Sequence, residues 1–357
     1  MKLLIQPEDG IAPLVAAIKH ARKHVDIVIF RFDRAEIEDA LKAAAKRGVS
    51  VTALIASANH GGEKSLRKLE MRLLGEGVTI ARTSGDLVRY HDKLLVIDRR
   101  VLYMLSFNLT YLDVDHSRGF GIVTRKKKLV HEALALIGAD SERTPYEAGV
   151  DTFVVSPLNA RAQILSLIQR AKKELLVYDP KITDVQMLKA LNEQAHKGVD
   201  VRVIGSVSRR AHHLKVRALE GFRLHTRTIV RDRREAFVGS QSLRKAELDS
   251  RREVGLIVRD PRVVRGIVDT FAADWRAKDS VETPCATPRE LKKMLRARVR
   301  KLSHLDPLVR EALKEVVSKT DGSATLNTRQ MKDTVEKAVK EAVRERVQEM
   351  LNESAEQ

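Results

Sequence analysis

Two segments of this 357-residue chain carry the same kinds of reactive side chain at the same spacing. Each segment has a histidine, a basic residue two positions later and an aspartate five positions after that. These residues are His91, Lys93 and Asp98 in the first segment, and His225, Arg227 and Asp232 in the second. A histidine can act as a nucleophile or exchange protons, and Lys or Arg can hold anionic oxygens, so the pair suits chemistry on a phosphate ester. One such pattern arises by chance in a basic chain, but two in register indicate a duplicated site.

The spacing is preserved beyond the two motifs. Each member of the second motif lies 134 positions after its counterpart in the first. The same offset relates Ser106 to Ser240, Asn108 to Ser242, and Gly121 to Gly255. Upstream of the motifs the offset is 150, as for Gly48 and Gly198, because the first copy has extra residues that fall mainly in 81–90. A period this long is typical of a duplicated domain and not of a solenoid.

The duplicated pattern resembles the phospholipase D superfamily, whose hallmark is two copies of His-x-Lys-x4-Asp, each followed by a Gly/Ser-x-Asn segment. The resemblance covers residues 1–280 and has three departures. Arg227 replaces the second Lys, and Ser242 replaces the second Asn. The acidic residue that often follows the motif is present as Glu253 in the second copy but is replaced by Gly119 in the first. Because the copies have diverged, we expect their roles to differ.

The resemblance implies a reaction that needs no metal and no other cofactor. One histidine attacks phosphorus to give a phosphohistidine, while the other protonates the leaving alcohol. The groups expected to hold the phosphate oxygens are Lys93, Ser106, Asn108, Arg227, Ser240 and Ser242. The more complete first motif favours His91 as the nucleophile; in the alternative, Glu253 would orient His225 and raise its basicity. We expect Asp98 and Asp232 to fix local structure through hydrogen bonds.

The superfamily includes phospholipases, cardiolipin and phosphatidylserine synthases, and nucleases. We expect phosphatidyl transfer or hydrolysis on anionic phospholipid, similar to the bacterial cardiolipin synthase and phospholipase D branch. Two unequal copies with an extended segment at 81–90, expected to form the rim of the cleft, suit an asymmetric site for two substrates. The alternatives are a nuclease that cleaves DNA or RNA and an inactive module that binds phosphate-rich polymers. A formal charge of +18, of which about +15 lies on residues 1–280, is compatible with all three.

The elements that must position these residues follow an α/β pattern. Each copy reads as helix, strand, helix, strand, helix and a strand that carries the motif, which predicts two tandem α/β sandwich repeats related by a pseudo-twofold axis. Glycines at Gly48 and Gly198 end the second helix of each copy, and Gly221 is expected to end the third helix of the second copy. Alternation along the motif strand places His91 and Lys93 on one face. The predicted domains are a first repeat at 1–142, a linker at 143–152, a second repeat at 153–280 and a helical basic tail at 281–357.

Composition limits the setting of the protein. The lone Cys285 cannot form an internal disulfide, and the first residues turn polar too early for a signal peptide. No apolar run approaches the roughly 18 residues of a membrane span. We therefore expect a cytoplasmic protein, soluble or peripheral at the inner membrane face, with an anionic phospholipid or membrane surface as its substrate and a nucleic acid as the alternative partner. A monomer is expected; oligomerisation through the C-terminal helices is the alternative.

Overall fold

The computed structural model describes residues 1–277, except for 57–62, 84 and 209–213. Residues Met1–Ser280 form one compact unit that contains both copies of the repeat. The helical tail expected over 281–357 lies outside the described residues. Within the described part of the chain, none of the helices is long and apolar enough to cross a membrane.

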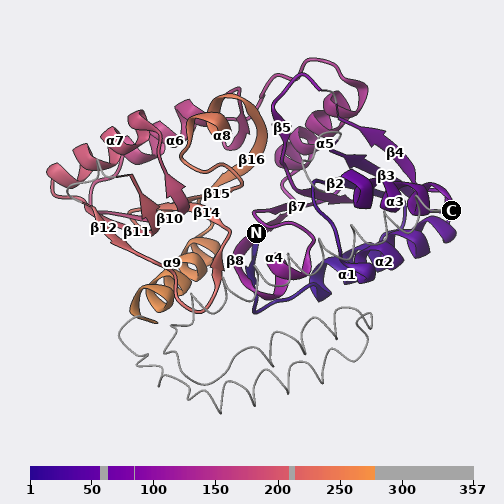
Figure 1. Ribbon diagram of the computed structural model, residues 1–357, viewed down its shortest axis with the longest axis horizontal. Helices are drawn as coiled ribbons and strands as arrows, with labels where there is room; N and C mark the ends of the chain where they lie inside the picture. Colours follow the sequence, from indigo (N-terminus) through magenta and orange to yellow (C-terminus); the bar gives the residue numbers. More distant parts are fainter. Residues whose placement is uncertain (57–62, 84, 209–213, 278–357) are drawn as a thin grey trace, which may run out of the picture. The chain divides into compact units, whose positions relative to one another are not determined.

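The first repeat is built on a mixed β-sheet (Figure 1). In order across the sheet, its strands are β1 (Lys2–Gln6), β8 (Ser117–Thr124), β7 (Val101–Leu105), β6 (Leu94–Ile97), β2 (His24–Ile29), β3 (Ser50–Ile55) and β4 (Thr79–Arg82). Strands β2, β3 and β4 pair in parallel, whereas β2, β6, β7, β8 and β1 pair antiparallel in turn. Every residue of β6 is apolar and buried, as expected for a strand with both faces covered.

The second repeat has the same order of strands. These are β9 (Phe153–Ser156), β16 (Arg251–Val258), β15 (Glu235–Gly239), β14 (Arg227–Arg231), β10 (Glu174–Ile182), β11 (Asp200–Val207) and β12 (Lys215–Arg217). The predicted α/β duplication is therefore confirmed.

Helices cover both faces of each sheet. In the first repeat, α1 (Ala12–Lys19), α2 (Ala35–Lys46) and α3 (Glu63–Leu74) lie in the chain between successive strands, and α5 (Lys127–Glu142) follows β8. In the second repeat, α6 (Ala160–Gln169), α7 (Val185–His196) and α9 (Pro261–Arg276) correspond to α1, α2 and α5, and α3 has no counterpart among the described residues. Each repeat also has one short helix, α4 (Tyr111–Asp115) in the first and α8 (Lys245–Asp249) in the second. Helices α2 and α7 end at the predicted glycines, Gly48 and Gly198, which take positive φ angles of 83° and 88°.

The third helix predicted for the second copy is not found among the described residues. The segment before Gly221 instead contains β12, in which Lys215–Arg217 pair in parallel with β11. A short helix before Gly221 would be marginally stable on its own, because most helical stability comes from packing. The three residues of β12 instead gain hydrogen bonds by extending the edge of the sheet.

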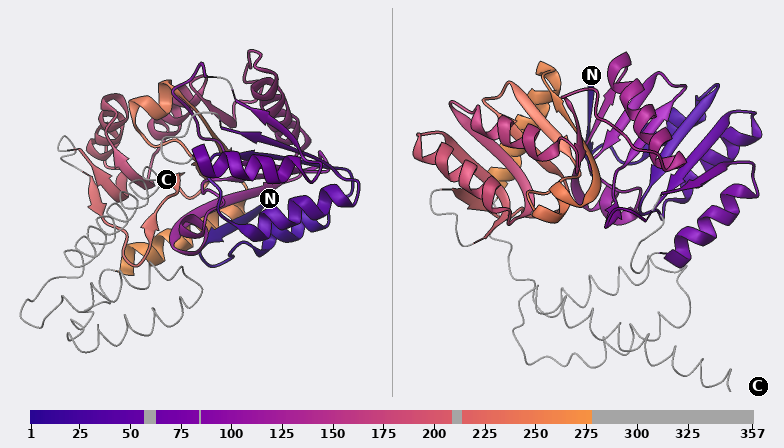
Figure 2. Two further views of the ribbon diagram at one scale, coloured as in Figure 1. Left: turned by 45° about the vertical axis from the view of Figure 1, so that its right-hand side comes forward. Right: turned by 90° about the horizontal axis from the view of Figure 1, so that it is seen from above.

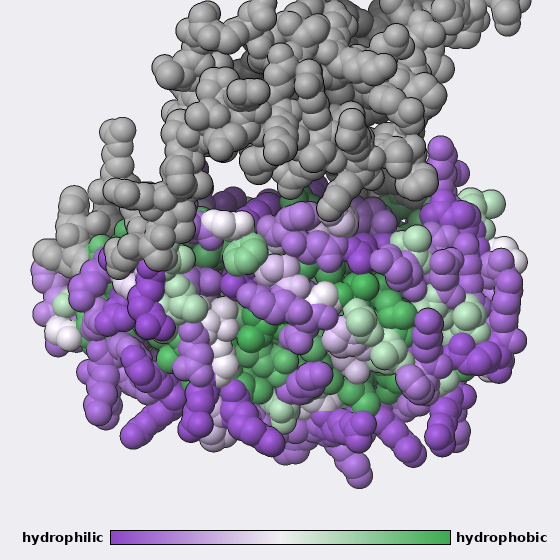
Figure 3. All heavy atoms as spheres, turned by 90° about the horizontal axis from the view of Figure 1, so that it is seen from below, coloured by the Kyte–Doolittle hydropathy of each residue, from purple (hydrophilic) through white to green (hydrophobic). Residues whose placement is uncertain are grey.

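The two repeats share a hydrophobic core. One cluster of buried side chains belongs to the first repeat and another to the second, but the largest contains residues of both sheets and of α5 and α9, such as Leu136 and Phe271. Figure 2 shows the first repeat, in indigo to magenta, beside the second, in pink to orange. On the face drawn in Figure 3, hydrophobic residues of the described part are visible between surrounding hydrophilic ones.

Each repeat also lends a two-residue strand to the other. β5 (Arg89–Tyr90), from the first repeat, runs parallel to the start of β16, and β13 (Arg223–Leu224), from the second repeat, runs parallel to the start of β8. The paired residues in the two exchanges correspond at the offset of 134. The end of the 81–90 segment therefore has a counterpart, contrary to the expectation that the whole segment is unique to the first copy.

Candidate active site

The exchanged strands lead directly into the two motif histidines. The main-chain amide of His91 donates to the carbonyl of Arg252 at 2.8 Å, and that of His225 donates to the carbonyl of Arg118 at 3.2 Å. Each histidine is thus anchored to the other repeat. This corrects the expectation that His91 and Lys93 lie on one face of a single strand: the strands of the motifs begin only at Leu94 and at Arg227, because the main-chain amides of His91 and His225 bond to the opposite repeat.

His91 is held by a carboxylate of the second repeat. Its Nδ1 lies 2.8 Å from Oε2 of Glu253, and its ring packs in a T-shaped arrangement with that of Phe30 at a centroid distance of 4.4 Å. The imidazole is 10% exposed and the carboxylate is fully buried. The alternative in which Glu253 orients His225 does not fit this geometry: Glu253 contacts His91 of the other repeat, because the start of β16 pairs with β5, which precedes His91.

His225 has no such carboxylate. Its Nδ1 is buried without a hydrogen-bond partner among the described residues, and its Nε2 lies 3.5 Å from Oδ2 of Asp113. The residue that corresponds to Glu253 is Gly119, where a Cβ atom would lie only 2.9 Å from the ring of Phe107. The first repeat thus has no room for a side chain at the place from which a carboxylate would reach His225.

The basic residues of the two motifs occupy equivalent places. Nζ of Lys93 donates to the main-chain carbonyl of His91, and Nη1 of Arg227 donates to that of His225. Lys93 is 4% exposed, whereas Arg227 is half-buried. Arg227 therefore keeps the position of the expected Lys as well as its charge.

A buried carboxylate supports the polar residue that follows each motif. Oδ2 of Asp113 accepts from the main-chain amide of Asn108 at 3.0 Å and from its Nδ2 at 2.5 Å, and Glu247 accepts from the main-chain amide of Ser242 at 2.7 Å. Ser242 has a second support, because its hydroxyl donates to Asp179 at 3.0 Å. Asn108 keeps a buried side-chain oxygen that has no partner among the described residues.

The remaining predicted residues lie within the framework. The hydroxyl of Ser106 accepts from the amide of Phe120 at 2.9 Å, and that of Ser240 accepts from the amide of Val254 at 3.1 Å. Both serines thus connect neighbouring strands, and direct phosphate binding by their hydroxyls stays a prediction.

Asp98 and Asp232 lie in the hairpin turns at the far ends of β6 and β14. The carboxylate of Asp98 accepts from the main-chain amides of three residues, Arg22, Lys23 and His24, and that of Asp232 accepts from the amides of Lys172, Lys173 and Glu174. These bonds lower the pKa of both aspartates, while burial opposes the shift. Both residues have a φ of 52°, a left-handed conformation that Asp tolerates better than most residues.

Comparisons with known proteins agree with this geometry. The family model described as "Cardiolipin synthase, PLD-like domain" matches residues 14–140 and 164–275. This chain belongs to the phospholipase D-like family. Cardiolipin synthase A of Proteus mirabilis is 24% identical over 73% of the chain, which spans 66% of that relative's length.

Two solved structures share the phospholipase D-like fold. Polyphosphate kinase from Porphyromonas gingivalis matches with a TM-score of 0.66 and 19% identity, over 77% of this chain and 47% of the kinase. Phosphatidylserine synthase from Haemophilus influenzae matches with a TM-score of 0.59 and 12% identity, over 77% of this chain and 86% of the synthase.

The electrostatics of this phospholipase D-like site are those of a buried cationic pocket. Burial lowers the pKa of both His91 and His225 well below the usual value, and the charges of Lys93 and Arg227 act in the same direction. Burial also lowers the pKa of Lys93 to about 7 and raises that of Glu253 to about 7. An anion in the site would stabilise the protonated imidazoles and the ammonium group.

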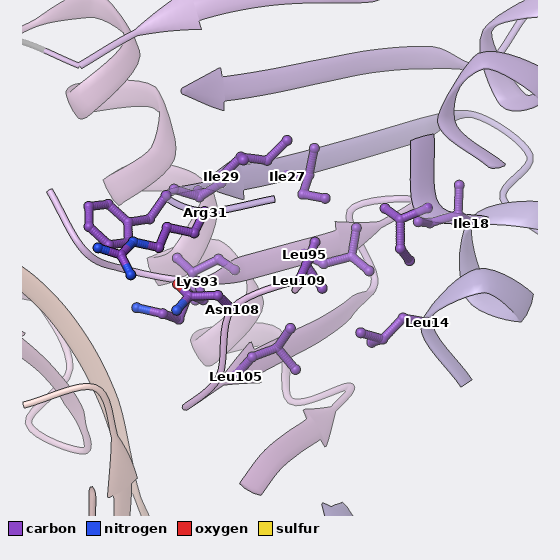
Figure 4. A pocket seen from close by; sticks show the side chains of 14 residues that line it. Leu14, Ile18, Ile27, Ile29, Arg31, Lys93, Leu95, Leu105, Asn108 and Leu109 are labelled. Carbon is purple, nitrogen blue, oxygen red and sulfur yellow. The ribbon is translucent and has the colours of Figure 1, made fainter. Parts of the chain in front are cut away.

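A narrow cavity lies beside Lys93 in the first repeat (Figure 4). Arg31, Lys93 and Asn108 gather at one end, and apolar side chains such as Leu14 and Ile18 line the other. Its volume of about 10 Å³ leaves room for no more than a water molecule. The apolar end therefore belongs to the packed core of the repeat.

Sequence reasoning missed four residues of the site, Phe30, Asp113, Asp179 and Glu247. The offset of 134 relates Asp113 to Glu247 and was a usable signal, since both are acidic. Phe30 and Asp179 lie far from the motifs in the chain and differ from their counterparts, so no repeat of residue type marks them. Among the described residues, no group of three His, Cys, Asp or Glu side chains could hold a metal ion.

Proposed function

We propose that the chain is a phosphodiesterase or phosphatidyltransferase that acts on phospholipids through a phosphohistidine on His91. The observation that carries this proposal is the 2.8 Å contact between Nδ1 of His91 and Glu253. A carboxylate that accepts the Nδ1 proton fixes the tautomer whose Nε2 has a free lone pair, which is the form that can attack phosphorus.

The reaction would proceed in two displacements. Nε2 of His91 attacks phosphorus, the bond between phosphorus and the ester oxygen breaks, and the leaving alcohol takes a proton from His225. Water or a second alcohol then gives its proton to His225 as its oxygen attacks phosphorus, and the P–N bond breaks. The products are the new ester or acid and both histidines in their starting states.

The cations of the site serve charge neutralisation and proton control. Lys93 and Arg227 come from opposite repeats and would hold the non-bridging oxygens, which carry the negative charge of the phosphodiester. Because the empty site lowers the pKa of His225, this residue would gain its proton together with the anionic substrate. Binding of the substrate would thus produce the protonated His225 that cleavage of the substrate requires.

Apolar side chains at the edge of the site favour an amphiphilic substrate. Val88 and Phe222 occupy equivalent positions three residues before His91 and His225, and are 68% and 37% exposed. Tyr111 and Leu112 on α4, close in the chain to Asn108, are 58% and 50% exposed. Apolar residues in these places suit contact with lipid, and the name of the Proteus mirabilis relative agrees with this choice.

Incubation of the full chain with phosphatidylglycerol vesicles, in the presence of EDTA, tests the proposal. We expect lipid products from the wild type and from the control His131→Ala, whose side chain is exposed on α5, and none from His91→Ala. Parallel incubations with single-stranded and double-stranded DNA separate the nuclease alternative. Cleavage of DNA with a steep salt dependence and no turnover of vesicles would reject the lipid assignment.

A further inference from the structure

Three arginines beside His91 are only partly neutralised by carboxylates. The guanidinium carbons of Arg31 and Arg89 lie 5.6 Å and 5.5 Å from the centre of the Phe30 ring, which the ring of His91 contacts. Within the described part of the chain, neither arginine has an ion pair. Both guanidinium groups therefore lie at the first half-site without a carboxylate in direct contact, although Glu253 and Glu247 act on Arg89 from a greater distance.

The third member of the cluster is Arg251, whose backbone pairs with that of Arg89. Its Nη1 lies 3.4 Å from Glu247, but its Nε is buried without a hydrogen-bond partner among the described residues. Burial, Arg251 and Arg31 together lower the pKa of Arg89. A buried guanidinium donor without an acceptor is costly, and like charges in contact add to the cost unless an anion binds.

The second half-site does not repeat this arrangement. The counterpart of Arg89 is Arg223, whose Nη1 donates to the buried carboxylate of Asp113 and to the hydroxyl of Ser117 at 3.2 Å. The counterpart of Phe30 is Pro180, which offers no aromatic ring. Among the described residues, the second half-site has one arginine without an ion pair, Arg227, whereas Arg31 and Arg89 lie together beside the ring that His91 contacts.

We propose that Arg31, Arg89 and Arg251 form a second phosphate subsite, which binds the phosphate of an acceptor phospholipid next to the phosphate that reacts at His91. This inference rests on the proposed function and specifies its acceptor. Transfer of a phosphatidyl group to the free hydroxyl of phosphatidylglycerol gives a product with two phosphodiesters joined by one glycerol. A second cationic subsite close to the nucleophile matches the separation of charge in that product.

The lipid assignment is favoured over a neighbouring nucleotide by the surroundings of the subsite. Val88, next to Arg89 in the chain, is 68% exposed, and Leu87 packs against the buried cluster of Phe30 and Tyr90. Apolar residues thus adjoin the arginines, as a site for a lipid headgroup and its glycerol backbone requires.

The test compares two acceptors in the same enzyme. The full chain receives phosphatidylglycerol in mixed micelles as the donor, with either phosphatidylglycerol or deuterated glycerol as the acceptor, and mass spectrometry separates the products. We expect Arg89→Gln to raise the KM for the phosphatidylglycerol acceptor by about 10- to 100-fold, the loss of one or two charge-assisted hydrogen bonds. Transfer to deuterated glycerol, which carries no phosphate, should stay within about twofold. Arg100→Gln, in the distant hairpin after β6, is the matched control and should change neither.

Equal loss with both acceptors, or no loss with either, would overturn the subsite. A stronger effect of Arg89→Gln on cleavage of longer oligonucleotides than of dinucleotides would overturn the choice of a lipid. Binding of glycerol 1,3-bisphosphate and glycerol 3-phosphate, measured by calorimetry, gives a readout without turnover: the wild type should prefer the bisphosphate, and Arg89→Gln should lose that preference. A wild type that prefers the bisphosphate but converts no lipid would refute the proposed function and the lipid acceptor together. A wild type that converts lipid but shows no preference for the bisphosphate would refute the subsite alone.

Discussion

The two half-sites share a framework and differ at the reacting atoms. In both, an exchanged strand anchors the histidine to the opposite repeat, a cation bonds the carbonyl of that histidine, and a buried carboxylate supports the polar residue that follows. Among the residues that the structure describes, the first half-site alone has a carboxylate on Nδ1 of its histidine and an aromatic ring in contact with the imidazole.

This comparison shows which features the duplication requires and which serve the reaction. Elements that hold the two repeats together are found twice, because each repeat must fold against the other. Elements that differ touch the histidines, and their difference turns an approximately symmetric frame into a site with two roles. Exchange of strands explains how this arises, since a change in β16 alters the environment of the histidine in the other repeat.

The largest difference is expected between the two histidines themselves. His91→Ala removes the nucleophile and should lower kcat by a factor on the order of 10⁴ to 10⁶ for every substrate. His225→Ala removes the acid, and should lower turnover of a phospholipid by about 10²- to 10⁴-fold while sparing most of the activity on a p-nitrophenyl phosphodiester, whose leaving group needs no proton.

Trapping at high pH followed by mass spectrometry gives a second measurement, because a phosphohistidine survives alkali. The adduct should form on His91 in both the wild type and His225→Ala. An adduct on His225 in the wild type would reverse the assignment of roles.

Removal of the distinguishing carboxylate should have the next largest effect. Glu253→Ala is expected to lower kcat by about 10²- to 10⁴-fold with little change in KM, because the His91 ring loses its orientation and its tautomer. Glu253→Gln should fall between this variant and the wild type, since an amide oxygen can still accept the Nδ1 proton. Glu193→Gln, on α7 with a side chain that is 46% exposed, is the control. A rise in KM at constant kcat would place Glu253 in substrate binding and contradict the positioning role.

The shared framework can be broken through its two crossed ion pairs. Arg118 binds Asp274 of α9 through two hydrogen bonds of 2.8 and 3.0 Å, and Arg252 binds Asp140 of α5 through two of 3.1 and 2.9 Å. All four residues are buried, and each pair joins one repeat to the other. Loss of Asp140 leaves the buried charge of Arg252 without an ion pair among the described residues, which costs about 3–5 kcal/mol.

The two pairs should not be equal. Arg118 keeps a second ion pair, with Glu8 at 2.7 Å, and an Asn at position 274 could still accept from the hydroxyl of Tyr178. Asp140→Asn is therefore expected to lower the free energy of unfolding more than Asp274→Asn does. Urea denaturation measures both, with Lys189→Gln as the control, because its exposed pair with Glu193 contributes less than about 1 kcal/mol. A larger loss in Asp274→Asn would contradict this ranking.

The sequence predicted the helices and strands of each repeat better than the contacts that each repeat makes with the other. Apolar runs and glycine stops are local signals, and they indicated the strands around both motifs and the ends of α2 and α7. The exchanged strands have only two residues each, too few to show alternation, so nothing in the sequence indicated that Glu253 would reach His91. Phe30 and Asp179 escaped for a related reason, since each is brought to the site by a strand or strand end that lies more than 40 residues before its motif.

The smallest effect is expected from making the second half-site more like the first. Arg227→Lys keeps the charge, and the ammonium group can reach the carbonyl of His225 as Lys93 reaches that of His91. The guanidinium also has its Nε 3.4 Å from the hydroxyl of Ser242, which Asp179 holds from the other side, and Lys cannot keep both contacts. We therefore expect kcat/KM to fall by less than about tenfold, equivalent to under about 1.4 kcal/mol.

Ser242→Asn should lower kcat/KM more than Arg227→Lys does, since the hydroxyl is fully buried against Asp179 and extra atoms in a packed site cost about 1–3 kcal/mol. Measurement of both variants with the p-nitrophenyl substrate isolates the phosphate clamp from lipid binding, and a gain of activity in Arg227→Lys would show that the second half-site is a weakened copy of the first and not one adapted to its own role.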